Sequence, residues 1–300
     1  MTATNFNLQR AQERKADEFY TRIEDVSAEC EHYRKYFKDQ TIYCNCDEPS
    51  QSAFVRYFMK HGKAIGIRKI IATCFRRGSR GLFFDSTTTD EPLTLKGDGD
   101  FRSAECINQL RQADIVVTNP PFSLFREYIV QLVKFDKKFL VLGNINAVTY
   151  RVLFPLIRDG KIRLGYESRG MSFRVPRSYV LYTQSGYEDE NGDKYVKHCN
   201  TVWYTNLPVN KPGRPLTDRY EQQSIFGDNQ RFIKYDNYNA IEVPKTSDIP
   251  LDYDGVMGVP ITFLDKYNPS QFEILDFTKH ASLRGKVKYD RILIKHKRLP

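Results

Sequence analysis

The residues best suited to chemistry in this chain are the consecutive Asn119, Pro120, Pro121 and Phe122. The exocyclic amine of a nucleobase is a poor nucleophile, because its lone pair is delocalised into the ring. The Asn119 side-chain oxygen and the Pro120 carbonyl can each accept one N–H from such an amine. This would draw the amine towards a tetrahedral, nucleophilic geometry while Phe122 stacks on the base. The chemistry requires neither an acid–base residue nor a covalent intermediate.

The four residues directly follow an apolar, β-branched run at 114–118. Such a run predicts a strand, and neither proline can extend it. In doubly wound α/β sheets, ligands bind beyond the carboxyl ends of the strands. The position therefore suits a binding site, although a Pro-Pro turn after a buried strand is the structural alternative.

Strands and helices alternate along the first half of the chain with short connections between them. We expect strands at 41–46, 69–75, 114–118 and 138–142, a hairpin arm at 81–84, and helices at 27–37, 50–61, 104–112 and 124–134. This alternation predicts an α/β fold with a mainly parallel, doubly wound sheet. After Tyr150 the pattern changes to strands at 162–166, 171–175 and 201–207, with a hairpin signal at Asn191-Gly192.

From Pro208 onward, prolines, asparagines and tyrosines dominate, and the periodicity is weak until a strand at 291–294. We therefore divide the chain into a catalytic region at 1–207 and a smaller, irregular region at 208–300. The second region is the candidate for target recognition, and the segment 168–195 is the alternative.

The bulk composition sets broad limits. The 300 residues include 46 lysines and arginines against 37 aspartates and glutamates, a formal net charge of +9, which suits a polyanionic partner without proving one. The six cysteines have no metal-ligand or disulfide-framework spacing, so we expect no zinc site and a reducing compartment. A polar N-terminus and the lack of an apolar stretch of about 18 residues predict a cytoplasmic protein without a membrane span.

Two further segments carry residues suited to a cofactor. Asp100 and Phe101 close a strand ahead of the Asn-Pro-Pro-Phe strand, where a carboxylate can accept a hydrogen bond from an adenine amine and an aromatic ring can cover the base. The segment 44–52 lies where the first strand turns into a helix, at which backbone N–H groups approach a cofactor. It lacks the glycines of a pyrophosphate-binding turn. S-adenosylmethionine has no pyrophosphate, and its ammonium group suits Asp47 or Glu48. A plain turn is the alternative at both places.

Basic and amide side chains gather towards the C-terminus. Arginine and lysine neutralise phosphates, whereas asparagine, glutamine and arginine can read base edges. A solvated charged surface is the alternative. We expect base contacts from Arg219, Gln222, Gln223, Asn229 and Arg231, and phosphate contacts from Lys295, Lys297 and Arg298.

Several strings, taken in order, resemble the adenine-specific DNA methyltransferases of the EcoRI modification-methylase type. They are KGDGDFRS at 96–103, DIVVTNPPFSLFREY at 114–128, FLVLGN at 139–144 and DGVMGVPITFLD at 254–265. The resemblance covers most of the chain. It implies a Rossmann-like class I methyltransferase fold, S-adenosylmethionine as cofactor, and double-stranded DNA as partner of a monomeric enzyme without a metal. It leaves open whether a cognate restriction endonuclease exists.

Carried over by position, the resemblance assigns the target adenine to Asn119–Phe122 and the amine of the cofactor's adenine to Asp100. Asp47 with Ser52 would hold the methionine end, and Phe19-Tyr20-Thr21 resembles an amino-terminal cofactor segment. One departure concerns the ribose. The wider superfamily has a glycine-rich first loop and an acid after the second strand, whereas Thr73-Cys74-Phe75 offers no acid. The ribose contact is therefore unassigned.

The leading interpretation is transfer of a methyl group from S-adenosylmethionine to N6 of adenine in double-stranded DNA. The base must be flipped out, because an adenine amine inside a duplex is unreachable. Methylation of RNA or of a protein glutamine amide uses the same residues and is the alternative among enzymes. A catalytically inactive DNA-binding protein is the alternative outside enzymes, and the intact Asn119–Phe122 with Asp100 argues against it.

Overall fold

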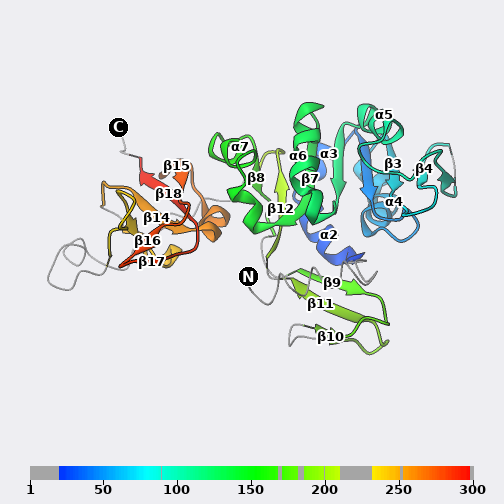
Figure 1. Cartoon of the computed structure of the whole chain (residues 1–300). Coiled ribbons are helices and arrows are strands. Elements are labelled where there is room, and N and C mark those ends of the chain that lie inside the picture. Colours follow the sequence, from blue (N-terminus) through cyan, green and yellow to red (C-terminus); the bar gives the residue numbers. More distant parts are fainter. Residues whose placement is uncertain are drawn as a thin grey trace. The chain divides into compact units, whose positions relative to one another are not determined.

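The computed structural model describes residues 20–88, 90–167, 171–181, 186–198, 200–209, 232–250 and 253–297 (Figure 1). The chain divides into two compact units. Unit 1 comprises Met1–Asn144 and Gly165–Leu207, and unit 2 comprises Ile145–Leu164 and Pro208–Pro300. The division expected from the sequence also falls after Leu207, but it assigns Ile145–Leu164 to the catalytic region, whereas the structure groups this segment with unit 2.

A large mixed sheet forms the centre of unit 1. Within this unit its strands lie in the order β5 (Leu93–Thr94), β4 (Leu82–Asp85), β3 (Lys69–Cys74), β2 (Thr41–Cys46), β6 (Ile115–Thr118), β7 (Lys138–Asn144) and β12 (Thr201–Thr205). The central strands β3, β2, β6 and β7 pair in parallel, as expected. The flanking strands β4, β5 and β12 are antiparallel. The sheet is therefore mixed, with a parallel centre.

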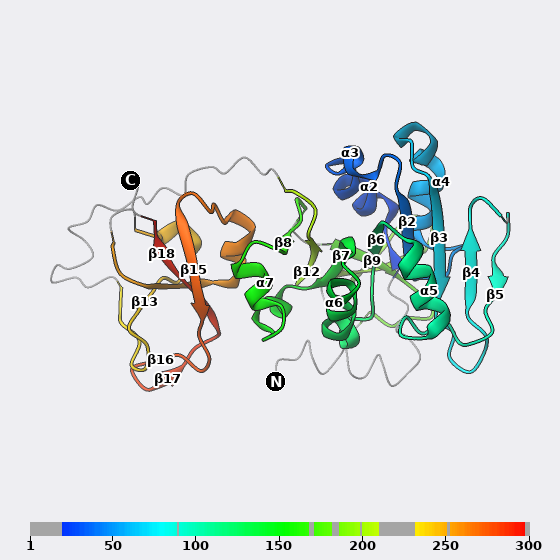
Figure 2. The same ribbon diagram turned by 90° about the horizontal axis from the view of Figure 1, so that it is seen from above.

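Helices cover both faces of this sheet (Figure 2). On one side lie α2 (Ile23–Glu31), α3 (Arg34–Phe37) and α4 (Ala53–Ile65), and on the other lie α5 (Ala104–Gln112) and α6 (Phe125–Lys134). Large aromatic side chains fill the space between the layers. Phe54 of α4 is fully buried and packs edge-on against Trp203 of β12, with 6.1 Å between ring centroids. Cover on both faces explains why the parallel strands are continuous apolar runs.

Two helices differ from the expected ones at their ends. The helix expected at 50–61 is α4, which begins after Ser52, whose hydroxyl accepts the N–H of Val55, and ends at Gly66 with a φ of 81°. Gly62, the expected end, lies inside the helix, because the left-handed residue that ends it is Gly66. The side chain of Ile67 packs on Gly62, where a Cβ would lie 2.5 Å from its Cδ1 atom. The single helix expected at 27–37 is two helices, α2 and α3, which are separated at the buried Tyr33.

A second, smaller antiparallel sheet belongs to unit 1. Its order is β1 (Tyr20–Thr21), β9 (Met171–Val175), β11 (Lys194–His198) and β10 (Gly186–Glu188). The expected hairpin turn joins β10 to β11, with Gly192 at a φ of 75°. Tyr20 lies opposite Arg174, whose guanidinium is 5.6 Å from the Tyr20 ring centroid. The amino-terminal segment is thus the edge strand of this sheet.

Unit 2 contains helix α7 (Phe154–Arg158), strand β8 (Arg163–Leu164) and a sheet in the order β13 (Ile241–Glu242), β14 (Met257–Pro260), β18 (Arg291–His296) and β15 (Phe272–Phe277). A separate hairpin pairs β16 (Ser282–Leu283) with β17 (Lys286–Val287). Short 3₁₀ turns are η1 (Phe122–Leu124) in unit 1 and η2 (Ile145–Thr149), η3 (Thr246–Asp248) and η4 (Ile261–Lys266) in unit 2. A half-buried ion pair joins Arg291 to Glu242 at 2.7 Å.

The expectation of an irregular region at 208–300 is wrong in part, because the described residues 232–250 and 253–297 contain a four-stranded sheet and a hairpin, joined by irregular segments. Phe272 and Ile274 are buried on either side of the exposed Glu273, and this alternation is a strand signal. A bulge between Ile274 and Asp276 interrupts it. Several strands here are also only two to six residues long, too short for a periodicity to stand out.

The loop at 97–100 lies directly against the end of β3. Backbone hydrogen bonds from Arg76 to Asp98 at 2.8 Å and from Gly81 to Gly97 at 2.9 Å hold it there. Gly99 has a φ of 82°, and a Cβ at this residue would lie 2.0 Å from the carbonyl oxygen of Cys74. Glycine satisfies both the left-handed backbone and the close approach. The loop therefore brings Asp100 to the carboxyl edge of the sheet.

Gly99→Ala should destabilise unit 1 more than the matched change Gly78→Ala. Both glycines have left-handed backbones, with φ of 82° and 72°, but a Cβ at Gly78 would meet nothing within 4 Å. The left-handed conformation costs an alanine about 1–2 kcal/mol, and the clash at Gly99 should add about 1–3 kcal/mol. Urea denaturation measures the two free energies of unfolding. Equal losses would show that the approach to β3 does not constrain this residue.

Candidate active site

Asn119 lies where the order of strands in the sheet reverses. From β2 the chain passes through α4 to β3 on one side, whereas β6 lies on the other side of β2. Such switch points are where open α/β sheets bind ligands. Thr118 ends β6, and its hydroxyl donates to the carbonyl oxygen of Asn45 in β2. Asp47 and Asn119 therefore follow two neighbouring strands at the same edge of the sheet.

The Asn119 side chain is ready to accept a hydrogen bond. Its Oδ1 atom is buried and has no hydrogen-bond partner within the described residues. Most buried polar atoms in proteins are paired, and leaving one unpaired costs about 1–3 kcal/mol. A donor that enters the site removes this cost. Phe122 begins η1 and is half-buried, so part of its ring is accessible beside the tetrapeptide, while Pro121 is exposed.

Buried contacts behind the tetrapeptide hold it in place. The hydroxyl of Tyr128 in α6 donates to Oδ1 of Asn45, which ties the helix after Asn119 to β2. The Phe101 ring packs edge-on against Tyr128, with 5.1 Å between centroids, and Gln131 donates to the Phe101 carbonyl at 2.9 Å. Because Phe101 is only 6% exposed, its side chain supports the loop from within, and its contact with a cofactor stays a prediction.

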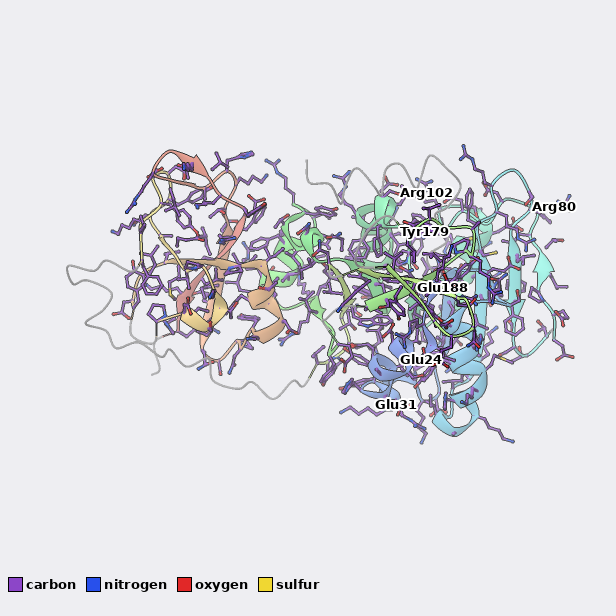
Figure 3. The ribbon with its side chains drawn as sticks, turned by 90° about the horizontal axis from the view of Figure 1, so that it is seen from below. Glu24, Glu31, Arg80, Arg102, Tyr179 and Glu188 are labelled. Carbon is purple, nitrogen blue, oxygen red and sulfur yellow. The ribbon has the colours of Figure 1, made fainter. Side chains whose placement is uncertain are left out.

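Asp100 is paired with Arg102. The guanidinium donates to both carboxylate oxygens, from Nε at 3.0 Å and from Nη2 at 2.7 Å. These hydrogen bonds from Arg102 hold the pKa of Asp100 below its usual value, so the carboxylate is ionised, and its remaining lone pairs can accept another donor. Arg102 also donates to Glu127 of α6 at 2.9 Å. It thereby joins the Asp100 loop to the helix after Asn119, on the opposite side of unit 1 from Glu24 and Glu31 of α2 (Figure 3).

Asp47 lies in the turn from β2 to α4. Burial raises its pKa to about 7, against the effect of a 3.4 Å hydrogen bond from the Ser52 hydroxyl. No cationic side chain pairs with it within the described residues. The preceding Cys46 has a φ of 84°, a left-handed conformation that glycine adopts most readily. The turn therefore has a backbone feature of a glycine-rich loop without the glycine, and it carries a carboxyl group that a cation would stabilise.

The structure brings an acid to the end of β3, where the sequence offers none. The Glu48 carboxylate lies 3.1 Å from the guanidinium of Arg76, two residues after this strand. Phe75, which lies between the end of β3 and Arg76 in the sequence, is 49% exposed. Sequence reasoning weighed Glu48 only as a partner for an ammonium group. It missed this position, and also the role of Arg102, because both depend on ion pairs between separate loops and helices that leave no periodic signal.

Thr21 carries another buried acceptor. Its Oγ1 atom has no hydrogen-bond partner within the part of the chain that the structure describes. Tyr20 and Thr21 form β1 directly before α2, and α2 packs against α4. Phe19 lies outside the described residues, and the cofactor roles of all three residues stay predictions.

Of the predicted DNA-binding residues, the structure describes Lys295 and Lys297. Lys295 lies in β18 opposite Glu273 of β15, and Lys297 is exposed after the strand. Their contacts with DNA stay predictions. The other residues of this set lie outside the described part of the chain: Arg219, Gln222, Gln223, Asn229, Arg231 and Arg298.

The described residues contain no group of three or more histidines, cysteines or acids that could hold a metal ion. Among the same residues, no helix is both long and apolar enough to cross a membrane. The cysteines there are free and wholly or partly buried, and burial raises the pKa of each thiol. They are Cys30, Cys44, Cys46, Cys74 and Cys106.

The unpaired amide oxygen of Asn119, at the switch point of an α/β sheet, suits an enzyme that methylates an amine. The family model described as adenine-specific methyltransferase EcoRI matches residues 7–92 and 84–298. The chain belongs to this family and is an adenine-specific DNA methyltransferase. This membership decides against the alternatives among enzymes, methylation of RNA or of a glutamine amide.

Three relatives match nearly the whole chain. It is 46% identical to the Type II methyltransferase M.EcoRI of Escherichia coli, over 99% of this chain and 98% of the relative. Identity is 39% with the Type II methyltransferase M.MgeORF184P of Mycoplasma genitalium, over 90% and 86% of the two chains. Identity is 37% with the Type II methyltransferase M.MpnI of Mycoplasma pneumoniae, over 96% of this chain and 97% of the relative. No solved structure gives a significant match.

Asp47→Asn should stabilise the protein more at neutral pH than in acid. The folded protein holds the Asp47 proton up to about pH 7, whereas the unfolded chain releases it near pH 4. The unfolded state therefore binds fewer protons in this interval, and wild-type stability falls as the pH rises from about 4 to about 7. Asparagine removes this loss. In urea denaturation, the gain of the variant over wild type should be roughly 1–4 kcal/mol larger at about pH 7.5 than at about pH 4.5.

The matched control is Asp90→Asn, at an exposed position. Its difference from wild type should be the same at both pH values. If Asp47→Asn behaves like this control, the Asp47 carboxyl is already ionised in the folded protein well below neutral pH.

Proposed function

We propose that this enzyme transfers a methyl group from S-adenosylmethionine to N6 of an adenine flipped out of double-stranded DNA. The observation that carries the proposal is the buried, unpartnered Oδ1 of Asn119 at the switch point of the sheet. An adenine amine is a donor of the kind that this atom lacks. An amine inside a duplex cannot reach a buried atom, so the base must leave the helix before it can react.

On the substrate side, the Asn119 Oδ1 atom and the Pro120 carbonyl each accept one N–H of the amine. These two bonds draw the nitrogen lone pair out of conjugation with the ring. The half-buried Phe122 covers the base, a contact worth about 1–3 kcal/mol for stacking on an aromatic ring. Because both hydrogen bonds improve as the nitrogen becomes tetrahedral, they stabilise the transition state more than the bound substrate.

On the cofactor side, the residues at this edge fit S-adenosylmethionine, whose sulfonium supplies an electrophilic methyl group. The Asp47 carboxyl, which has no cationic partner, would hold the ammonium group, and the Ser52 hydroxyl orients it. Asp100 would accept the amine of the cofactor's adenine. Glu48, which its ion pair with Arg76 holds near the end of β3, would accept the ribose hydroxyls. The missing glycines fit this cofactor, since it has no pyrophosphate to cradle.

The parallel centre of the sheet, its helices on both faces and the site at the switch point support a Rossmann-like class I fold. We assign target recognition mainly to 208–300, with 168–195 as the alternative. That the enzyme acts as a monomer stays an expectation from the family resemblance, which leaves open whether a cognate restriction endonuclease exists.

Asn119→Ala should abolish methyl transfer and leave the binding of cofactor and DNA largely intact. The missing hydrogen bond acts mainly in the transition state, and removing one such interaction lowers kcat by roughly 10²–10³ or more. Transfer of labelled methyl groups to duplex DNA measures the rate, and fluorescence anisotropy measures DNA binding. Asn108→Ala, at an exposed position of α5, is the control and should be fully active. Activity within a few-fold of wild type would remove Asn119 from the mechanism.

Asp100→Ala should weaken the binding of S-adenosylmethionine by about 1–3 kcal/mol, the cost of leaving a hydrogen-bonding group without its partner. Arg102→Ala breaks the same ion pair but keeps the acceptor, so it should weaken binding less. Isothermal calorimetry compares the two variants. Equal effects would mean that Asp100 acts only by holding Arg102. Unchanged affinity in Asp100→Ala would remove Asp100 from the cofactor site and make Asp98 the candidate.

A further inference from the structure

The hairpin of unit 2 formed by β16 and β17 carries cations without acidic partners. From Lys279 to Tyr289 the sequence has no acid, and every residue from Arg284 to Tyr289 is exposed. Within the described residues, the side chains of Arg284, Lys286 and Lys288 form no ion pair. Arg291, further along the same basic run, is instead bound to Glu242. The charge of this hairpin is therefore available to an external anion.

Two large apolar side chains accompany these cations. Val287 is 66% exposed, and Tyr289 is 79% exposed. Val287 lies opposite Ser282 in the strand pairing, whereas Leu283, on the other face, packs against the core of unit 2. A partner that offers only negative charge would make no apolar contact with Val287 and Tyr289. Duplex DNA offers both kinds of contact, since phosphates bind cations and base edges, including the thymine methyl group, accept apolar contacts.

The hairpin is held rigidly in spite of its exposure. Asp236 accepts the backbone N–H groups of Arg284 at 3.1 Å and Gly285 at 2.9 Å, and Asn237 accepts that of Ser282 at 2.9 Å. The turn has a φ of 50° at Arg284 and 72° at Gly285, the two positive values of a type I′ turn. Arginine is a costly residue at such a position, where asparagine or glycine is preferred. Here it places a guanidinium at the tip of the ribbon.

We infer that the hairpin at 279–289 is a DNA-contacting ribbon. The inference rests on the proposed function, because duplex DNA is the substrate named there. The major groove, about 12 Å wide, admits a two-stranded β-ribbon. Val287 and Tyr289, on one face of the ribbon, contact base edges. Arg284 at its tip and the long side chains of Lys286 and Lys288, which leave from the other face, bind phosphates beside the groove and fix the position of unit 2 on the duplex. Because Asp236 holds the turn in advance, little conformational freedom is lost on binding.

The first test removes the charge. The triple variant Arg284→Ala, Lys286→Ala, Lys288→Ala should bind a duplex containing the methylation site roughly tenfold or more weakly near physiological salt. The slope of log K against log salt should become shallower by about 0.9 for each phosphate that the variant no longer neutralises. The control replaces three exposed lysines of α4 and α6 in unit 1 and removes the same charge; it should leave affinity and slope close to wild type. The three residues are Lys60, Lys63 and Lys134.

The second test separates the shape of the hairpin from its charge. Asp236→Ala makes the protein more positive by one charge, so simple attraction to DNA predicts tighter binding. The inference predicts weaker binding, because the turn loses both of its backbone acceptors. Binding as tight as wild type or tighter would contradict a preformed ribbon. Circular dichroism and urea denaturation confirm that each variant is folded.

The outcomes distinguish this inference from the function on which it rests. If the wild-type protein fails to methylate adenine in duplex DNA, the proposed function fails. If wild type methylates DNA but the triple variant binds with unchanged affinity and salt slope, only the hairpin inference fails.

Sedimentation tests whether a second copy of the chain, instead of DNA, covers the hairpin. The inference would be overturned if wild type sediments as a dimer and the double variant Val287→Ser, Tyr289→Ser sediments as a monomer that still binds DNA as tightly. This surface would then be an interface between copies of the chain.

Discussion

The parallel pairing of β2 with β6 is the contact on which the site depends. The two strands lie at the point from which the chain proceeds in opposite directions across the sheet, and their register decides which residues leave the edge together. Buried hydrogen bonds to both the carbonyl and the side chain of Asn45, from Thr118 and Tyr128, fix that register. A slip by one residue would turn every side chain of β6 to the other face, and the residues after β2 and β6 would no longer leave the edge in the same register.

The same edge concentrates groups that a sequence selected only for stability would avoid. Within the described residues, Asn119 carries a buried acceptor without a donor, Asp47 is a partly buried carboxyl without a cationic partner, and Cys46 has a left-handed backbone. The buried hydroxyls of Thr118 and Tyr128 close by are paired. Local violations of this kind mark positions where function and stability compete, and here they lie along the edge at which ligands are expected.

The sequence predicts the centre of unit 1 well, because its signals are local. The strand at 41–46 and the helix at 104–112 are found with the expected bounds, and Asn119 stands at a strand end because two prolines stop the ladder. What escapes prediction depends on distant contacts. Gly62 is predicted as the end of a helix, yet α4 continues to Gly66, whose left-handed backbone ends it. The Arg102 bridge joins a loop to a helix, and the short strands of unit 2 are identified only by their neighbours.

The buried cysteines affect the chemical reactivity of the enzyme. A thiol reacts with oxidants and alkylating reagents as its thiolate, and burial raises the pKa of the thiols of Cys44 and Cys46 in β2 well above the ordinary value. Cys44, which is 2% exposed, therefore stays protonated and shielded while the sheet is intact. A reagent can modify it only in molecules whose switch-point strands have opened. The rate of alkylation would then measure how often the catalytic edge unfolds on its own, apart from the rest of the chain.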